Sequence, residues 1–254
     1  MTKVISVHSF RGGTGKSNLT ANLAIAIAMA GKRVAVIDTD IQSPGVHVLF
    51  GLDEDSIKRS LNDFLWGNCS ISEAAFDVTP EPVSSANGTV YLIPSSIKAG
   101  EIARILNEGY NVLVLNEGLQ KVGQELNLDY LLIDTHPGLN RETLLSIAVS
   151  NELIIILRPD QQDFQGTGVT LQVAQKLDIS NISLVVNKVP MSYESSRVKS
   201  QVEKRFKVPV AAVVPVTDEM FQLGSRGIFL LKFPNLAYSD HVQTVASQVM
   251  KSPG

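Results

Sequence analysis

A glycine-rich segment near the amino terminus has the residue types and spacing to hold phosphate groups. Residues 11–17 read Arg-Gly-Gly-Thr-Gly-Lys-Ser and stand between a short β-branched run and a long apolar segment. Glycines let backbone N–H groups close around phosphate oxygens without hindrance from a Cβ. A helix that starts here points the positive end of its dipole at the same place. We therefore expect a nucleotide-binding loop formed by Gly12, Gly13, Thr14, Gly15, Lys16, Ser17 and Asn18.

The side chains of this loop fit ATP, although the loop departs from the common patterns. Lys16 would bridge the β- and γ-phosphates, and the Ser17 hydroxyl would bind Mg²⁺. The generic P-loop has a glycine five residues before its last glycine, where this chain has Phe10. The dinucleotide-binding pattern Gly-x-Gly-x-x-Gly fails too, because Asn18 stands at its last glycine. The loop is thus a variant phosphate loop.

Acidic residues follow two further apolar runs. Asp38 and Asp40 end the run at residues 34–37, and in an extended segment their carboxylates would point to the same side. Two acids beside a triphosphate would repel it unless they contact Mg²⁺ or the attacking water. Asp134 ends the run at residues 130–133 in the Walker B form, which holds Mg²⁺ through water.

Short apolar runs that alternate with helical patterns must position these residues. The strand-like runs are residues 4–7, 33–38, 90–93, 130–134, 153–157, 182–187 and 210–214, and the helical patterns are 17–30, 99–106, 141–149 and 169–177. Both the odd and the even positions of these runs are apolar, as expected for strands that are covered on both faces of the sheet. The alternation predicts an α/β fold, a doubly wound and mostly parallel sheet with helices on both faces. Ligands of such sheets bind at the carboxyl ends of the strands, where the motifs fall. Residues 53–66 predict one or two short helices, and residues 79–88 an exposed loop.

Length and composition limit the alternatives. The chain has 254 residues, 44% of them hydrophobic, and no linker divides it, so we expect a single domain over residues 1–254. A single cysteine excludes a disulfide framework. No apolar run approaches the roughly 20 residues of a membrane span and no secretory signal is visible, so a cytoplasmic location is expected. The net charge of −3 argues against a generic nucleic-acid binder. Residues 188–232, however, carry eight Lys or Arg against four Asp or Glu, which hints at a local basic face.

The double glycine after a basic residue resembles the deviant Walker A motif of the ParA/MinD family of P-loop ATPases, Lys-Gly-Gly-x-Gly-Lys-Ser/Thr. The resemblance extends from residue 3 to about residue 245 and is weakest over residues 52–88. It implies Mg²⁺-dependent ATP hydrolysis, with ATP and Mg²⁺ as cofactors. The matching residues imply a catalytic set of Arg11, Lys16, Asp38 and Asp40 and a metal set of Ser17, Asp38 and Asp134.

The resemblance also implies a base pocket and a role for position 11. The matching Asn contacts adenine in the family, and the segment after the matching Pro packs on the base, which points to Asn187, Pro215 and Asp218. The signature lysine of the family reaches across an ATP-sandwiched homodimer to the partner's phosphates. Arg11 keeps the charge at that position and adds a planar fork of donors. Either Arg11 or another cation such as Arg158 would take this role.

A ParA-type positioning ATPase is the function that the resemblance favours. Such a protein closes as a dimer on ATP, binds nucleoid DNA without sequence preference, and is released when an adaptor protein stimulates hydrolysis. The DNA-binding candidates come from the basic segment: Arg197, Lys199, Lys204, Arg205 and Arg226. In lacking the signature lysine, the chain resembles the ATPases that distribute carboxysomes. A plasmid or a chromosome is the alternative cargo.

Two other functions remain open. MinD-like ATPases cycle on membranes through a basic amphipathic helix at the end of the chain. Residues 241–254 contain one Lys and no large aromatic face, so no membrane partner is expected. A metabolic ATP-dependent enzyme on the same fold is the second alternative.

Overall fold

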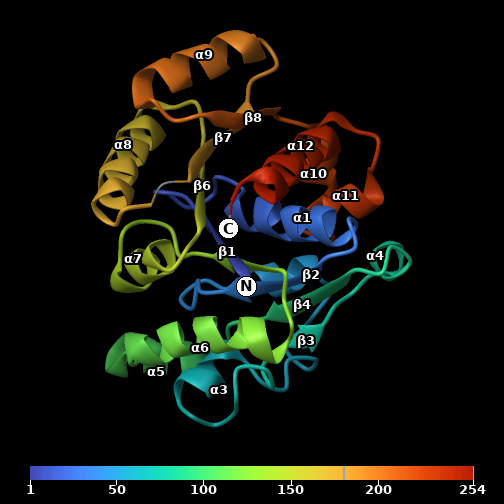
Figure 1. The fold of residues 1–254 in the computed structure, drawn as a ribbon, viewed down its shortest axis with the longest axis vertical. Helices are drawn as coiled ribbons and strands as arrows, with labels where there is room; N and C mark the ends of the chain where they lie inside the picture. Colours follow the sequence, from blue (N-terminus) through green and yellow to red (C-terminus); the bar gives the residue numbers. More distant parts are fainter. Residues whose placement is uncertain (180, 254) are drawn as a thin grey trace.

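An eight-stranded sheet forms the centre of the computed structural model, which describes residues 1–179 and 181–253 (Figure 1). The strands are β1 (Lys3–His8), β2 (Arg33–Asp38), β3 (Phe76–Asp77), β4 (Thr89–Ile93), β5 (Tyr130–Asp134), β6 (Glu152–Leu157), β7 (Ile182–Val189) and β8 (Val210–Pro215). Their order is β3-β4-β2-β5-β1-β6-β7-β8. All neighbours pair in parallel except β3, which pairs antiparallel with β4 at one edge.

Helices cover both faces of the sheet. One face carries α1 (Lys16–Ala28), α2 (Val46–Leu49), α4 (Glu81–Ser84), α10 (Asp218–Leu223), α11 (Phe229–Lys232) and α12 (Ala237–Lys251). The other face carries α3 (Leu61–Leu65), α5 (Ala99–Glu108), α6 (Val112–Glu125), α7 (Arg141–Ala148), α8 (Gln161–Lys176) and α9 (Ser195–Phe206). The predicted doubly wound, mostly parallel sheet is confirmed.

Burial on both faces explains why the strands read as apolar runs. Every residue of β6 is buried, and so is every residue of β2 after Arg33. The bounds of β2 and β5 match the predicted ones, because each run is closed by a buried acid, Asp38 and Asp134. α1 is buried nearly all round, since it lies between the sheet and α12.

Several helices differ from the sequence-based expectation. The predicted loop at residues 79–88 contains α4. Residues 53–66 contain one short helix, α3, which covers Leu61–Leu65 and starts at a capping box of Ser60 and Asp63. α8 begins at Gln161 rather than at residue 169, because Asp160 caps it by accepting the N–H of Asp163 at 2.9 Å. α6 was not predicted at all.

The last described helix is attached to the body of the protein through its apolar face. Tyr238, Val242, Val245 and Val249 of α12 are buried in the core that includes α1. At its end, Lys3 Nζ donates to the Val249 carbonyl at 2.7 Å. Within residues 1–179 and 181–253, no helix has both the length and the apolar character to cross a bilayer.

We predict that α8 tolerates an added methyl group at Gly168 but not at Gly166. A Cβ on Gly166 would overlap the ring of Phe10, which precedes the phosphate loop, whereas a Cβ on Gly168 meets only a Phe206 ring atom at 3.9 Å. Gly166→Ala should lower the free energy of unfolding by about 1–3 kcal/mol through overpacking. Gly168→Ala should leave it unchanged or raise it by up to about 1 kcal/mol, since alanine favours helix. Urea unfolding measures both, and equal destabilisation would contradict the prediction.

Candidate nucleotide-binding site

The glycine-rich loop joins β1 to α1 at the carboxyl edge of the sheet. Gly13 and Gly15 have φ angles of 75° and 97°, in the left-handed region that glycine adopts without strain. Gly15 has a second constraint, because a Cβ there would collide with the side-chain amide of Asn187. The loop is therefore shaped by its glycines and by close approach of β7, as a phosphate-binding loop requires.

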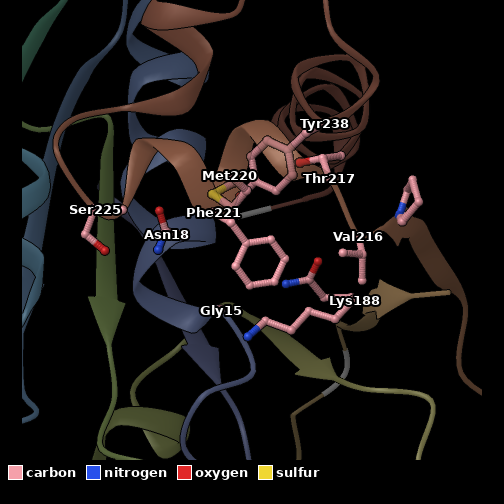
Figure 2. A pocket seen from close by; sticks show the side chains of 12 residues that line it. Gly15, Asn18, Lys188, Val216, Thr217, Met220, Phe221, Ser225 and Tyr238 are labelled. Atoms are coloured by element: carbon pink, nitrogen blue, oxygen red, sulfur yellow. The ribbon is translucent and has the colours of Figure 1, made fainter. Parts of the chain in front are cut away.

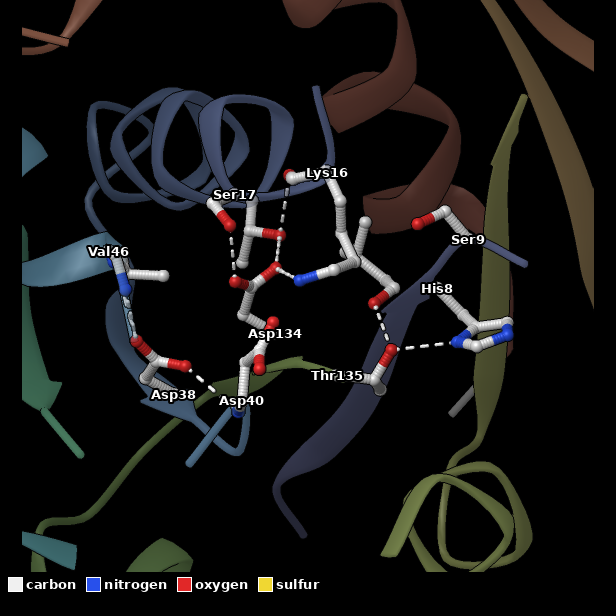
Figure 3. Close-up of polar contacts among 12 residues, drawn as sticks. His8, Ser9, Lys16, Ser17, Asp38, Asp40, Val46, Asp134 and Thr135 are labelled. Carbon is white, nitrogen blue, oxygen red and sulfur yellow. Dashed lines mark hydrogen bonds and ion pairs between the residues drawn. The ribbon is translucent and has the colours of Figure 1, made fainter. Parts of the chain in front are cut away.

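Asp134 connects the loop to β5 (Figure 3). Its carboxylate is 1% exposed and lies 2.8 Å from Lys16 Nζ. Ser17 Oγ donates to the other oxygen at 2.7 Å. Thr20, one turn further along α1, also donates to Asp134, at 2.9 Å. Sequence reasoning missed Thr20, although its position four residues after Lys16 on one helix face was a usable signal.

Three buried side-chain atoms of the loop have no hydrogen-bond partner among the described residues. They are Thr14 Oγ1, Lys16 Nζ and Asn18 Oδ1. Lys16 Nζ is close to Asp134, but the pair is not aligned as a hydrogen bond. Buried polar groups normally have partners, so three orphaned atoms in one loop suit a polar ligand. Their chemistry fits phosphate oxygens and Mg²⁺.

Asp38 and Asp40 lie beside Asp134, as the register pairing of Asp38 with Asp134 requires. Asp38 accepts backbone N–H groups from Asp40 at 3.0 Å and from Gly45 at 3.1 Å. Burial, followed by the negative charge of Asp134, raises the pKa of Asp38 to about 7. Burial also raises the pKa of Asp40, and Lys16 opposes the shift. The carboxylates are thus held close together at a place where a cation would relieve their repulsion.

The donor set suits magnesium bound together with phosphates rather than a metal held by protein alone. Mg²⁺ usually takes one or two carboxylates, a hydroxyl and substrate phosphates. The described part of the chain contains no cluster of three or more His, Cys, Asp or Glu in metal-binding geometry. The assignment of Ser17, Asp38 and Asp134 to Mg²⁺ stays a prediction.

A cavity of about 250 Å³ lies next to the loop (Figure 2). It is lined by Gly15, Asn18, Asn187, Lys188, Pro215, Val216, Thr217, Met220, Phe221, Gly224, Ser225 and Tyr238. Sequence reasoning had indicated Asn18, Asn187 and Pro215, but not the aromatic and Met side chains, which arrive from α10 and α12. Asp218 needs correction, because it lies exposed at the first turn of α10 and its neighbour Thr217 lines the cavity instead.

Asn187 holds the loop as well as lining the cavity. Its Nδ2 donates to the Thr14 carbonyl at 2.8 Å. The other side-chain atom, Oδ1, remains as an acceptor for a ligand amine. An adenine contact by Asn187 could use Oδ1 as an acceptor or the second N–H of Nδ2 as a donor.

Arg11 and Arg158 share one pair of carboxylates at the start of α8. Arg11 is 38% exposed, and its Nη1 lies 3.4 Å from Asp163 and 3.5 Å from Asp160. Arg158 is held more closely, with Nε 3.1 Å from Asp163 and its backbone N–H donating to Asp163 at 2.9 Å. Both candidates for the role in the dimer thus lie at one rim of the site, and Arg11 has the longer contacts.

The predicted DNA-binding residues are all exposed, but they do not form one face. Arg197, Lys199, Lys204 and Arg205 are on α9, whereas Arg226 follows α10 on the opposite layer. The expectation of a single basic face over residues 188–232 is therefore wrong, because β8 carries the chain from one layer to the other. On α9, Lys199 lies 4.0 Å from Glu203, and the Arg205 guanidinium lies over the rings of Phe164 and Phe206. Arg197 and Lys204, seven residues apart, share the outward face.

Comparisons with known proteins agree with this site. The sequence profile of a family described as an AAA domain matches residues 2–187. An uncharacterized ATP-binding protein of Methanocaldococcus jannaschii is 28% identical over 251 residues, which cover 98% of this chain and 88% of that protein. The septum site-determining protein MinD of Synechocystis sp. is 25% identical over 258 residues, covering 98% of this chain and 91% of MinD.

Solved structures share the fold over almost the whole chain. MinD from Pyrococcus horikoshii, complexed with Mg-ADP, superposes with a TM-score of 0.81 at 23% identity and covers 99% of this chain and 97% of that one. Apo McdA from Cyanthece gives a TM-score of 0.77 at 16% identity, covering 98% and 100%. With the phosphate loop, the buried carboxylates and the matched profile, this chain belongs to the AAA-domain family and, within it, to the ParA/MinD P-loop ATPases.

Proposed function

We propose that this chain is a ParA-type positioning ATPase. It binds Mg-ATP, pairs with a second copy across the nucleotides, binds nucleoid DNA without sequence preference, and leaves the DNA when an adaptor stimulates hydrolysis. The observation that carries the proposal is the convergence of Lys16, Asp38, Asp40 and Asp134 at one sheet edge, with Arg11 at its exposed rim. Buried charged side chains of this kind can support ATP hydrolysis. An exposed guanidinium at the rim of the site can contact the phosphates bound by a second copy of the chain.

Each side chain has a task in this proposal. Loop N–H groups and Lys16 would hold the phosphates, and Ser17 and Asp134 would hold a Mg²⁺ ion that would supply partial neutralisation of the phosphate charge. Asp40 is 8% exposed whereas Asp38 is fully buried, so Asp40 is better placed to orient a water molecule. Asp38, held by backbone N–H groups, supports this geometry from beneath.

His136 lies beside Asp40 at the edge of the carboxylate set. Its Nδ1 lies 2.6 Å from the Pro137 carbonyl, which can only accept a hydrogen bond, so Nδ1 carries a proton. In the neutral ring Nε2 is then an acceptor, and it lies 3.7 Å from Asp40 Oδ1. Two acceptors at this separation suit a bridging water.

We predict that Arg11, and not Arg158, is the cation needed for dimerisation. The contacts of Arg11 with Asp160 and Asp163 are longer and more exposed, so less is lost when Arg11 leaves them. Arg11→Ala should abolish the ATP-dependent dimer seen by sedimentation velocity and lower turnover by at least about tenfold. Arg158→Ala should keep the dimer. If neither variant changes dimerisation or turnover, the proposed trans role is wrong for both residues.

DNA binding is predicted to depend on ATP and on the outward face of α9. Wild-type protein should shift DNA of unrelated sequences with ATP but not with ADP, and the shift should weaken steeply as salt rises. The double variant Arg197→Glu with Lys204→Glu should lose it, whereas Lys121→Glu, an exposed change on α6, should not. Equal binding by all three proteins would contradict this assignment of the DNA surface.

The MinD-like alternative is favoured by the comparisons, because the Synechocystis relative and the Pyrococcus horikoshii structure are both MinD proteins. The apolar face of α12 packs on α1, so that helix as folded has no apolar face left for a lipid interface. Mixing the three proteins of the gel-shift experiment with anionic vesicles distinguishes the two functions. ATP-dependent binding to vesicles without binding to DNA would replace the proposed function by membrane cycling.

A further inference from the structure

Lys188, at the end of β7, has a backbone conformation that residues with a Cβ avoid. Its φ is 57°, in the left-handed region, and the pairing of β7 with β8 shifts register between Val186 and Val189. Conformations of this kind persist where the surroundings fix them, and they concentrate at functional sites. Lys188 also lines the cavity beside the phosphate loop (Figure 2).

The irregular backbone gives two neighbouring side chains access to the same loop. In a regular strand, consecutive side chains point to opposite faces of the sheet. Here Asn187 Nδ2 donates to the Thr14 carbonyl at 2.8 Å, and Lys188 Nζ donates to the Gly13 carbonyl at 2.8 Å. The left-handed residue therefore breaks the alternation and brings both donors to consecutive carbonyls of the phosphate loop.

These two contacts determine where the loop N–H groups point. A trans peptide is planar, with its C=O and N–H directed to opposite sides. Because Lys188 on β7 binds the Gly13 carbonyl, the Thr14 N–H of the same peptide points away from β7. Because Asn187 on β7 binds the Thr14 carbonyl, the Gly15 N–H also points away from β7. N–H groups aimed into the loop are what binds phosphate oxygens.

We propose that Lys188 is a positioning residue for the nucleotide. Its ammonium fixes the peptide between Gly13 and Thr14 for phosphate binding, and its methylene stem forms one wall of the base cavity. This inference rests on the nucleotide-binding part of the proposed function, and it requires neither DNA nor a dimer. Neither the phosphate-loop motif nor the carboxylate motifs include Lys188.

The test is the dissociation rate of Mg-ADP carrying a fluorescent label, measured by stopped flow on the full chain. Lys188→Met keeps the stem and loses the ammonium, so dissociation should be about fivefold faster, as expected for one lost charged hydrogen bond at an exposed position. Lys188→Arg can still donate to the Gly13 carbonyl and should stay within about twofold of wild type.

Lys207 provides the matched control. It is also an exposed lysine with a left-handed φ, of 58°, but it ends α9 and its ammonium makes no hydrogen bond or ion pair within residues 1–179 and 181–253. Lys207→Met should leave the dissociation rate unchanged. Both Lys188→Met and Lys207→Met should remain folded at the assay temperature without nucleotide, because Lys188→Met removes one hydrogen bond at an exposed position and Lys207→Met removes none.

Two outcomes would overturn the inference, and they differ from failure of the proposed function. A Lys188→Met protein that releases Mg-ADP at the wild-type rate removes the positioning role while wild-type binding stands. A Lys188→Met protein that releases faster only because it melts without nucleotide makes Lys188 merely structural. Wild-type protein that retains no Mg-ADP would instead refute nucleotide binding itself.

Discussion

The carboxylate of Asp134 is the constraint on which the site depends. It is buried, and it contacts Lys16, Ser17 and Thr20, which lie in the first two turns of α1. Removing one partner of a buried ion pair leaves the other charge without compensation, which is strongly destabilising. The pair therefore ties the position of the phosphate loop to the end of β5. The Lys16 ammonium has three N–H donors, so it can contact Asp134 and a phosphate at the same time.

The parallel sheet brings the other groups to this place. β5 lies between β1 and β2, so the phosphate loop on one side and Asp38 and Asp40 at the end of β2 on the other flank Asp134 directly. β7 and β8 lie further along the same edge and supply Asn187, Lys188 and the base cavity. The site is thus divided into a charged centre near β5 and a mostly apolar cavity near β8. A nucleotide with a charged tail and a flat base has this same division.

Sequence reasoning succeeded where one local pattern decides the structure. The apolar runs closed by Asp38 and Asp134 gave β2 and β5 to the residue, and the glycines gave the loop. It failed where distant elements decide. Phe221 and Tyr238 reach the cavity only because α10 and α12 pack beside α1, and no local pattern records that. The left-handed Lys188 is not predictable from local sequence for the same reason, since its φ angle accompanies a register shift between β7 and β8. The prediction of one basic face over residues 188–232 failed because residues that are close in sequence lie on opposite layers of the sheet.

The central claim is that Asp134 connects Lys16 and Ser17 to a magnesium-dependent nucleotide site, and the direct measurement is the ATP affinity of Asp134→Asn with Mg²⁺ and with EDTA. The amide keeps an acceptor for Ser17 but loses the charge. We expect the gain in affinity that Mg²⁺ gives the wild type to fall by about tenfold or more. Affinity in EDTA should change much less, because the loop N–H groups and Lys16 still meet the phosphates. An Asp134→Asn protein that keeps the full gain from Mg²⁺ would contradict the account.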